Sequence, residues 1–244
     1  MTRTIGGDSH RIDREEVQAF FARRVRSKLG GSAARLREED LAVAMLYGDS
    51  RDALRRSHEE FARVEPHLRL SETSRVLDVG CGIGRWAEHL VGSVAGYVGV
   101  DVVEELVAAA RQRFGAWSNA EFVYTNHAPA TTAISGQVFS HALVSGVVHY
   151  LDDSEVEALF DDLNRLIPGG ALYVRGPFSE DQRLTISEEW SVDLQDAYSA
   201  TYRTKYEFLQ LLPANYRVVT EGIPFQPMRP SRLTNQTFWI FHVC

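Results

Sequence analysis

The sequence predicts an α/β fold, in which a mainly parallel sheet carries helices on both faces and follows an N-terminal helical cap. From residue 75 onward, short apolar runs alternate with helical segments, the order that is typical of βαβ units. These runs are continuous rather than alternating, as in parallel strands that are covered on both faces. The first seventy residues are instead rich in Arg, Glu and Ala, which favours helices.

Residues 1–70 form the predicted cap, and residues 71–244 form the predicted sheet domain. Apolar side chains recur at helical spacing along the cap, and Gly30-Gly31 interrupts the pattern after the first helix. Apolar faces of these helices could form a homodimer interface. The predicted cap helices cover residues 14–26, about 38–46 and about 52–67.

The elements of the sheet domain follow from its apolar runs. The last two strands have no long helix between them, which predicts a hairpin that joins the sheet. Residues 177–204 are rich in aromatic side chains and are expected to be irregular. The predicted strands cover 75–80, 96–101, 121–126, 141–146, 171–176, 216–221 and 237–243. One predicted helix begins near residue 85, and three others cover 103–114, 155–167 and 206–212.

The composition disfavours several classes of protein. The chain has 44% hydrophobic and 24% charged residues, the usual balance of a globular protein. Its 26 basic and 33 acidic side chains give a net charge of −7, which disfavours nucleic acid and membrane surfaces as partners. No apolar run is long enough to cross a membrane, and the N-terminus has no secretory signal. With only two cysteines, the chain is expected to be cytoplasmic.

A glycine-rich loop follows the first strand of the predicted sheet domain. Gly80, Gly82 and Gly84 occupy every second position, which allows a tight turn and lets a ligand approach the backbone closely. The dinucleotide fingerprint requires a glycine where this chain has Arg85, which we expect to point into the following helix. Asp101 ends the next strand, where an acid can accept both hydroxyls of a ribose. The alternative is a tight turn with no ligand.

The segment from Asp78 to Gly84 (DVGCGIG), followed by GVD from Gly99 to Asp101, resembles the class I S-adenosylmethionine-dependent methyltransferases. The resemblance extends over roughly residues 75–174. It implies the seven-stranded sheet of that family, S-adenosylmethionine (SAM) as cofactor and S-adenosylhomocysteine (SAH) as product. The motif is specific for the cofactor and does not identify the methyl acceptor.

The resemblance also implies which residues contact the cofactor. The glycine loop would contact the methionine end, Asp101 the ribose hydroxyls, and Val102 the adenine. Asn126 stands where the family usually has Asp, a departure that keeps a carbonyl acceptor for the adenine amino group. The implied cofactor-binding residues are Tyr47, Asp78, Gly80, Cys81, Gly82, Gly84, Asp101, Val102, Asn126, His127 and Ser145.

His149 is the candidate catalytic residue. It follows the fourth strand at the carboxyl edge, where α/β sheets place their ligands, and histidine can take a proton near neutral pH. It would act as a general base or as a substrate ligand, and packing beside the strand is the alternative. No His or Cys pair has the spacing of metal ligands, so no metal site is expected.

Residues 177–204 follow the fifth strand, where insertions in the resembled family commonly form a substrate lid. Aromatic side chains with hydroxyl groups suit a small, partly polar acceptor such as a sugar, an amine or a phenol. A surface loop folded on its own aromatic residues is the alternative. The predicted substrate-contacting residues are Tyr150, Phe178, Trp190, Tyr198 and Tyr202.

The sequence thus predicts transfer of a methyl group from SAM to an O or N of a small molecule. The layout resembles methyltransferases of bacterial natural-product and deoxysugar pathways. RNA or protein methylation is an alternative, although the N/D-P-P-[YF] signature of base methylation is absent. Two others are a nicotinamide-dependent oxidoreductase, which Arg85 disfavours, and a non-catalytic SAM-binding protein, which His149 disfavours.

Overall fold

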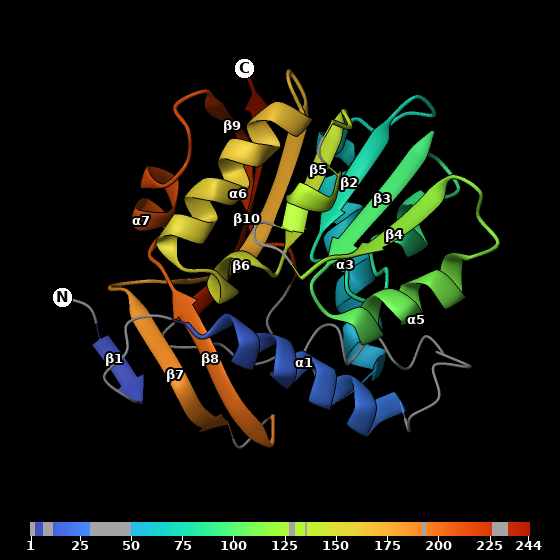
Figure 1. The fold of residues 1–244 in the computed structure, drawn as a ribbon. Coiled ribbons are helices and arrows are strands. Elements are labelled where there is room, and N and C mark those ends of the chain that lie inside the picture. The colour runs from blue at the N-terminus through green and yellow to red at the C-terminus, as the bar shows by residue number, and fades with distance from the viewer. Residues whose placement is uncertain are drawn as a thin grey trace.

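A central sheet of seven strands organises the computed structural model, which describes residues 3–6, 12–29, 50–126, 130–134, 136–191, 194–225 and 234–244 (Figure 1). The strand order is β4-β3-β2-β5-β6-β10-β9. The strands from β4 to β6 are parallel to one another, and β10 runs antiparallel to both β6 and β9. The predicted seven-stranded, mainly parallel sheet is confirmed. Its strands are β2 (Arg75–Val79), β3 (Gly96–Asp101), β4 (Ala120–Tyr124), β5 (His141–Ser145), β6 (Ala171–Ser179), β9 (Tyr216–Gly222) and β10 (Thr234–Val243).

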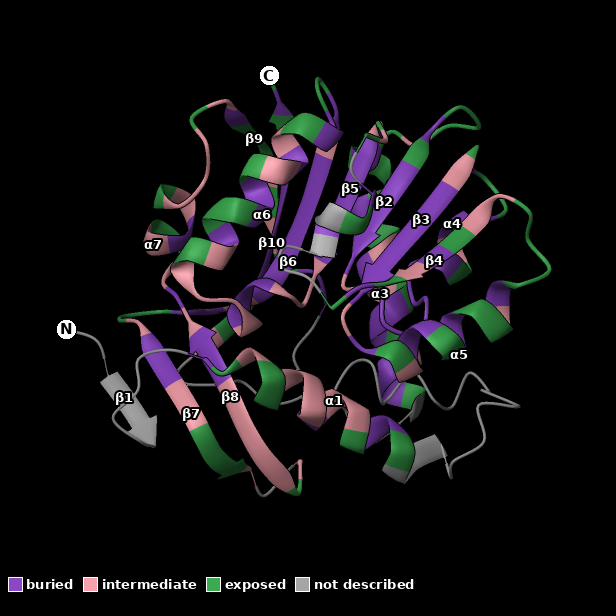
Figure 2. Ribbon diagram, in the orientation of Figure 1, coloured by how far each residue is buried: buried purple, intermediate pink, exposed green. Residues whose placement is uncertain are grey.

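Helices cover both faces of this sheet, each through its own apolar core. One core joins the sheet to α6 and α7, and the other joins it to α3, α4 and α5. The central strands are almost wholly buried between these layers, which explains their continuous apolar sequences (Figure 2). The helices are α3 (Ser50–Leu68), α4 (Ala87–Leu90), α5 (Glu104–Phe114), α6 (Asp153–Leu166) and α7 (Lys205–Gln210), with short 3-10 helices η3 (Ala130–Ile134) and η4 (Val148–Tyr150).

A second, three-stranded sheet replaces the irregular stretch that the sequence predicted. β7 (Leu184–Ser191) pairs antiparallel with β8 (Asp196–Tyr202), and β1 (Arg3–Gly6) pairs parallel with β7. The pairing register of β7 and β8 shifts between Ile186 and Glu189. This irregularity, together with the partial burial of β8, removes the regular alternation by which a half-buried strand is recognised.

The N-terminal helices lie in two different places. α1 (Arg14–Leu29) crosses the carboxyl ends of the sheet strands beside β8 and α5 (Figure 1). Ion pairs join it to both neighbours, from Arg23 to Asp196 at 3.2 Å and from Arg26 to Glu105 at 2.5 Å. α3 instead packs on the sheet within the core that contains α4. The helix predicted at about 38–46 lies outside the described residues.

None of the helices in the described part of the chain combines the length and apolar character that crossing a membrane requires.

Candidate functional site

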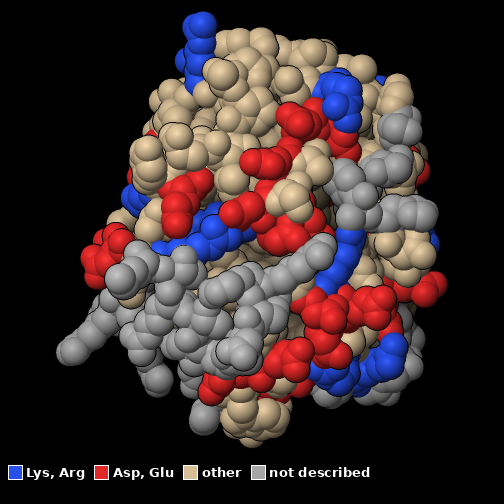
Figure 3. All heavy atoms as spheres, turned by 60° about the vertical axis from the view of Figure 1, so that its left-hand side comes forward, with Lys and Arg blue, Asp and Glu red and all other residues tan. Residues whose placement is uncertain are grey.

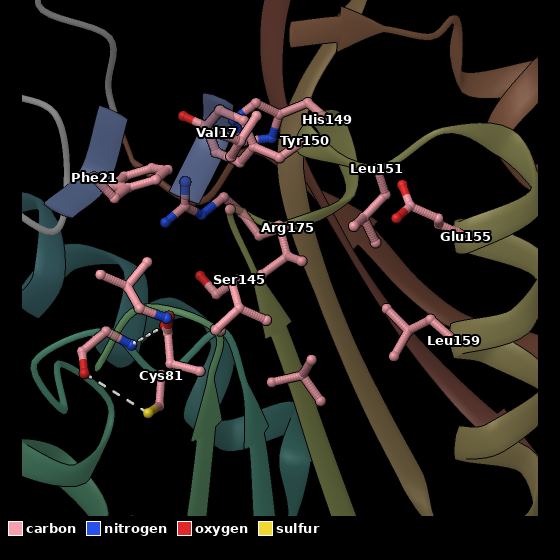
Figure 4. Close-up of a pocket in the computed structure, with 18 of the residues that line it drawn as sticks. Val17, Phe21, Cys81, Ser145, His149, Tyr150, Leu151, Glu155, Leu159 and Arg175 are labelled. Atoms are coloured by element: carbon pink, nitrogen blue, oxygen red, sulfur yellow. Dashed lines mark hydrogen bonds between the residues drawn. The ribbon is translucent and has the colours of Figure 1, made fainter. Parts of the chain in front are cut away.

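A cavity of about 580 Å³ lies at the carboxyl ends of the parallel strands, beneath α1 (Figure 4). This volume is typical of small-molecule sites. Figure 4 shows Cys81 and Ser145 on one side of the cavity and Phe21, His149 and Tyr150 on the other. The lining includes, from the glycine loop and β3, Asp78, Gly80, Cys81, Gly82, Arg85, Asp101 and Val102, and from the remaining elements Val17, Phe21, Ser145, His149, Tyr150, Arg175, Tyr198 and Tyr202.

The three glycines of the loop have different surroundings and different structural roles. Gly80 and Gly82 line the cavity with φ of +71° and +55°, a conformation that favours glycine. A Cβ on Gly80 would lie 2.4 Å from Cγ2 of Val147, so no side chain fits there without displacing Val147. Gly84 does not line the cavity, contrary to the sequence prediction. A Cβ at that position would lie 2.5 Å from the Phe114 ring, so Gly84 allows α5 to pack closely.

Asp101 joins the glycine loop to the start of α5. Its Oδ2 accepts from the Gly82 N–H at 2.8 Å, and its Oδ1 accepts from the Val103 N–H at 2.9 Å. Burial raises the pKa of Asp101, and these N–H groups act against the rise. A carboxylate oxygen that accepts one hydrogen bond keeps a lone pair for another. Asp101 and the adjacent Val102 could therefore contact a nucleoside bound against the loop.

Asp78 and Cys81 are buried beside the loop. The Tyr97 hydroxyl donates to Asp78 Oδ2, while burial raises the pKa of Asp78 to about 7. Burial also raises the pKa of the Cys81 thiol, so this side chain is not a thiolate nucleophile. Cys81 packs on the backbone of β3, because a Cβ on Gly99 would lie 2.8 Å from its sulfur.

A buried ionic cluster below the cavity was not predicted. Glu60 of α3 is fully buried and pairs with Arg85 Nη1 at 2.9 Å and with Arg175 Nε at 3.3 Å. Ser145 Oγ and the Tyr173 hydroxyl also donate to Glu60, at 3.1 and 2.6 Å. Burial raises the pKa of Glu60, but Arg175 and Arg85 outweigh it and bring the pKa to about 2. The expectation that Arg85 points into the following helix is wrong, because its guanidinium reaches Glu60.

Three tyrosine hydroxyl groups lie close together on the side of the cavity that carries Phe21 and His149. The Tyr198 hydroxyl lies 3.4 Å from that of Tyr150 and 3.1 Å from that of Tyr202. Phe21 of α1 packs edge-on against Tyr150, with ring centroids 5.3 Å apart. Burial raises the pKa of each tyrosine, so all three hydroxyls stay protonated near neutral pH. Val17 and Phe21 of α1 also line the cavity. The sequence analysis does not name them as site residues, because nothing local in α1 shows which side chains face the site.

His149 is part of η4, which forms one wall of the cavity. Arg203, the residue after β8, holds η4 in place through hydrogen bonds. Arg203 donates to the carbonyl oxygens of Val148 and Leu151 at 2.8 and 2.7 Å. The His149 ring lies 4.0 Å from the Tyr150 ring between centroids, and its Nδ1 has no hydrogen-bond partner among the described residues. Burial, with the charges of Arg175 and Arg203, lowers the pKa of His149 to about 3. The imidazole is therefore neutral near pH 7 and can accept a hydrogen bond, but with this pKa it is a weak base.

Three predicted site residues lie elsewhere. Phe178 is 2% exposed and packs against Phe208 and Trp239, because β6 continues to Ser179 and turns this side chain into the core. Trp190 is 60% exposed on β7, away from the cavity. Asn126 is exposed and does not line the cavity. Tyr47 and His127 lie outside the described residues.

Comparisons with known proteins agree with this arrangement. Residues 76–170 match the profile of a family described as "Methyltransferase domain". No curated protein sequence matches the chain. Similar solved structures include a SAM-dependent methyltransferase from Leishmania major, with 20% identity, a TM-score of 0.65, and coverage of 93% of this chain and 82% of that one.

Two further structures show the same fold. Phosphoethanolamine N-methyltransferase 1 from Haemonchus contortus, in complex with phosphoethanolamine and SAH, has 17% identity and a TM-score of 0.64, covering 94% of this chain and 48% of that one. Magnesium protoporphyrin IX methyltransferase from Synechocystis, with bound SAM, has 16% identity and a TM-score of 0.60, covering 95% and 99%. Residues 76–170 thus match a methyltransferase domain, and the chain as a whole has the fold of the SAM-dependent methyltransferases compared above.

Proposed function

We propose that this chain is a SAM-dependent methyltransferase and that it acts on an O or N atom of a small-molecule acceptor. The observation that carries the proposal is a single cavity that joins the glycine loop and Asp101 to a group of tyrosines with His149 and Arg175. Its volume suits two small molecules in contact rather than a polymer. The names of two structural neighbours give phosphoethanolamine and magnesium protoporphyrin IX as what those enzymes methylate, which supports a small acceptor.

The residues of the glycine loop fit SAM. The positive-φ glycines leave the backbone open to a ligand, and Asp101 keeps acceptor capacity for the ribose hydroxyls. Val102 would border the adenine, and Ser145 the methionine portion. When bound, SAM supplies a methyl carbon activated by its sulfonium, which the acceptor atom attacks as SAH leaves. The protein's contribution is therefore largely to align the acceptor and to exclude water.

His149 would accept a hydrogen bond from the O–H or N–H group of the acceptor and so orient the atom that attacks the methyl carbon. Its imidazole is neutral, lines the cavity and is held by η4 beside Tyr150. The tyrosine hydroxyls would orient polar groups of the acceptor through hydrogen bonds. Phe21 and Val17 would cover the bound molecules from α1.

Incubation with SAM and separate panels of sugars, amines, phenols, RNA and peptides tests the proposal. We expect SAH release, and a product heavier by one methyl group, with at least one small molecule. Methylation of only RNA or peptide would overturn it, and a chain that binds SAH but methylates nothing would favour the non-catalytic alternative.

Replacing Asp101 with asparagine is expected to weaken SAH binding by about 1.5–3 kcal/mol, the scale of a lost charge-assisted hydrogen bond. Asparagine cannot accept from Gly82, Val103 and a ribose together, because it has one acceptor oxygen. Calorimetric titration with SAH measures the change. Glu104→Gln, at an exposed position three residues later at the start of α5, is the matched control, with unchanged affinity expected. Equal affinity of Asp101→Asn and the parent chain would remove Asp101 from the cofactor site.

The cytoplasmic location, the homodimer, the absence of nucleic-acid and membrane partners and the natural-product pathway stay predictions of the sequence. On the face drawn in Figure 3, acidic side chains form a broad band with separate basic groups among the described residues. This distribution supports a partner other than nucleic acid.

A further inference from the structure

We propose that the methyl acceptor carries a carboxylate, bound by Arg175 next to the O or N atom that receives the methyl group. This inference rests on the proposed small-molecule methylation and names the class of acceptor. It follows from the charge of the buried cluster, from the position of Arg175 and from the neighbours of its guanidinium.

The buried cluster holds two cations and one anion. Arg85 and Arg175 are both less than one-tenth exposed and share the carboxylate of Glu60. Burying a charge without a matching opposite charge costs free energy, so a site of this composition favours an anionic ligand. Asp78 interacts electrostatically with Arg85, and its carboxyl is largely occupied by the Tyr97 hydroxyl. Asp101 is engaged by two backbone N–H groups on the cofactor side.

Of the two arginines, Arg175 faces the acceptor side. It lies on β6 and lines the cavity, and Figure 4 shows its guanidinium reaching between Ser145 and Tyr150 toward Phe21. Its Nη1 lies 3.4 Å from Gln236 Oε1, a long contact to a neutral group. Its charge adds to the effect of burial in lowering the pKa of His149 and opposes the rise that burial causes in the pKa of Tyr150, so Arg175 lies near both side chains.

The neighbouring groups place the carboxylate close to the nucleophile. His149 follows β5 and Arg175 ends the adjoining part of β6, with Ser145 and Arg175 paired in register. A Cβ on Gly176 would lie 3.8 Å from His149 Nδ1, so the imidazole packs against the residue directly after Arg175. Both side chains line the same part of the cavity, so an acceptor that contacts both would carry its hydroxyl or amine near its carboxylate, as in an ortho-substituted aromatic acid. Arginine binds carboxylates through paired N–H donors, which suits this role.

Two matched pairs of probes test the inference: salicylate with salicylamide, and anthranilate with anthranilamide. Each pair keeps the hydroxyl or amine and changes only the charge of the neighbouring group. Titration into SAH-saturated protein is expected to show that at least one acid binds roughly tenfold or more tightly than its amide. In Arg175→Met this preference is expected to fall to about one. In Arg165→Met, which removes an exposed arginine of α6, it is expected to persist.

The outcomes separate the possible sources of the anion. Arg175→Met should bind SAH as tightly as the parent chain, whereas a large loss would assign Arg175 to the cofactor carboxylate and overturn the inference. The inference is also overturned if neither acid binds more tightly than its amide, if that preference persists in Arg175→Met, or if the acids bind only without SAH. Acid binding that depends on Arg175, in a chain that methylates only RNA or peptide, would reject the proposed function and keep the anion site.

Discussion

Replacing Glu60 with glutamine is expected to lower the free energy of unfolding by about 3–5 kcal/mol, the cost of removing one partner from a buried ion pair. The substitution keeps the shape of the side chain, but it leaves Arg85 and Arg175 buried without their shared carboxylate. It also weakens the hydrogen bonds from Ser145 and Tyr173, because an amide oxygen is a poorer acceptor than a carboxylate. Urea unfolding followed by circular dichroism measures the loss.

Glu59→Gln, one residue earlier on α3, makes the same change of charge at the surface. Glu59 pairs with Arg55 at 2.5 Å with both side chains partly exposed, so its loss is expected to cost less than about 1 kcal/mol. Adding Arg175→Met to Glu60→Gln removes one of the two arginines that have lost their carboxylate partner. The double variant should therefore recover part of the lost free energy of unfolding. Equal losses for Glu59→Gln and Glu60→Gln would show that the cluster adds no more than a surface pair.

The contrast between the glycine loop and the Glu60 cluster shows what the sequence could predict. Gly80, Gly82 and Asp101 end neighbouring parallel strands, and their spacing along the chain already implies their meeting at one sheet edge. Glu60 meets Tyr173 and Arg175 across more than a hundred residues of chain. Its helix carries many charged residues, so only tertiary packing distinguishes the one that is buried.

The same reason explains the two errors in the predicted lid. Phe178 follows a predicted strand in an aromatic stretch, which favours a place in a lid, but β6 extends past it to Ser179 and pairs with β10. Trp190 belongs to β7, whose partner β1 comes from the other end of the chain. Composition identified aromatic residues near the site, whereas strand length and pairing decided which of them reach it. Tyr198 and Tyr202 reach it from β8.

Replacing His149 with leucine is expected to lower kcat by a factor of about 10², the scale of a misplaced reacting group. Leucine fits the same wall, but it has no atom that accepts a hydrogen bond from the acceptor. SAH affinity should be nearly unchanged, since His149 belongs to the aromatic side of the cavity. His242→Leu, at an exposed histidine on β10, is the matched control and should retain full activity. Steady-state rates with the acceptor identified by the panel measure the effect.

The pH dependence gives this prediction a second readout. Because burial and the charges of Arg175 and Arg203 lower the pKa of His149 to about 3, the imidazole is neutral throughout the range from about pH 5 to 8. Protonation of His149 would abolish its function only below that range. The parent chain and His149→Leu should therefore have pH–rate profiles of the same shape between these limits, differing only in height. An acid limb near the ordinary pKa of histidine, present in the parent and absent from the variant, would show a solvated imidazole that titrates during turnover. That result would contradict the buried, neutral His149 on which the proposed role depends.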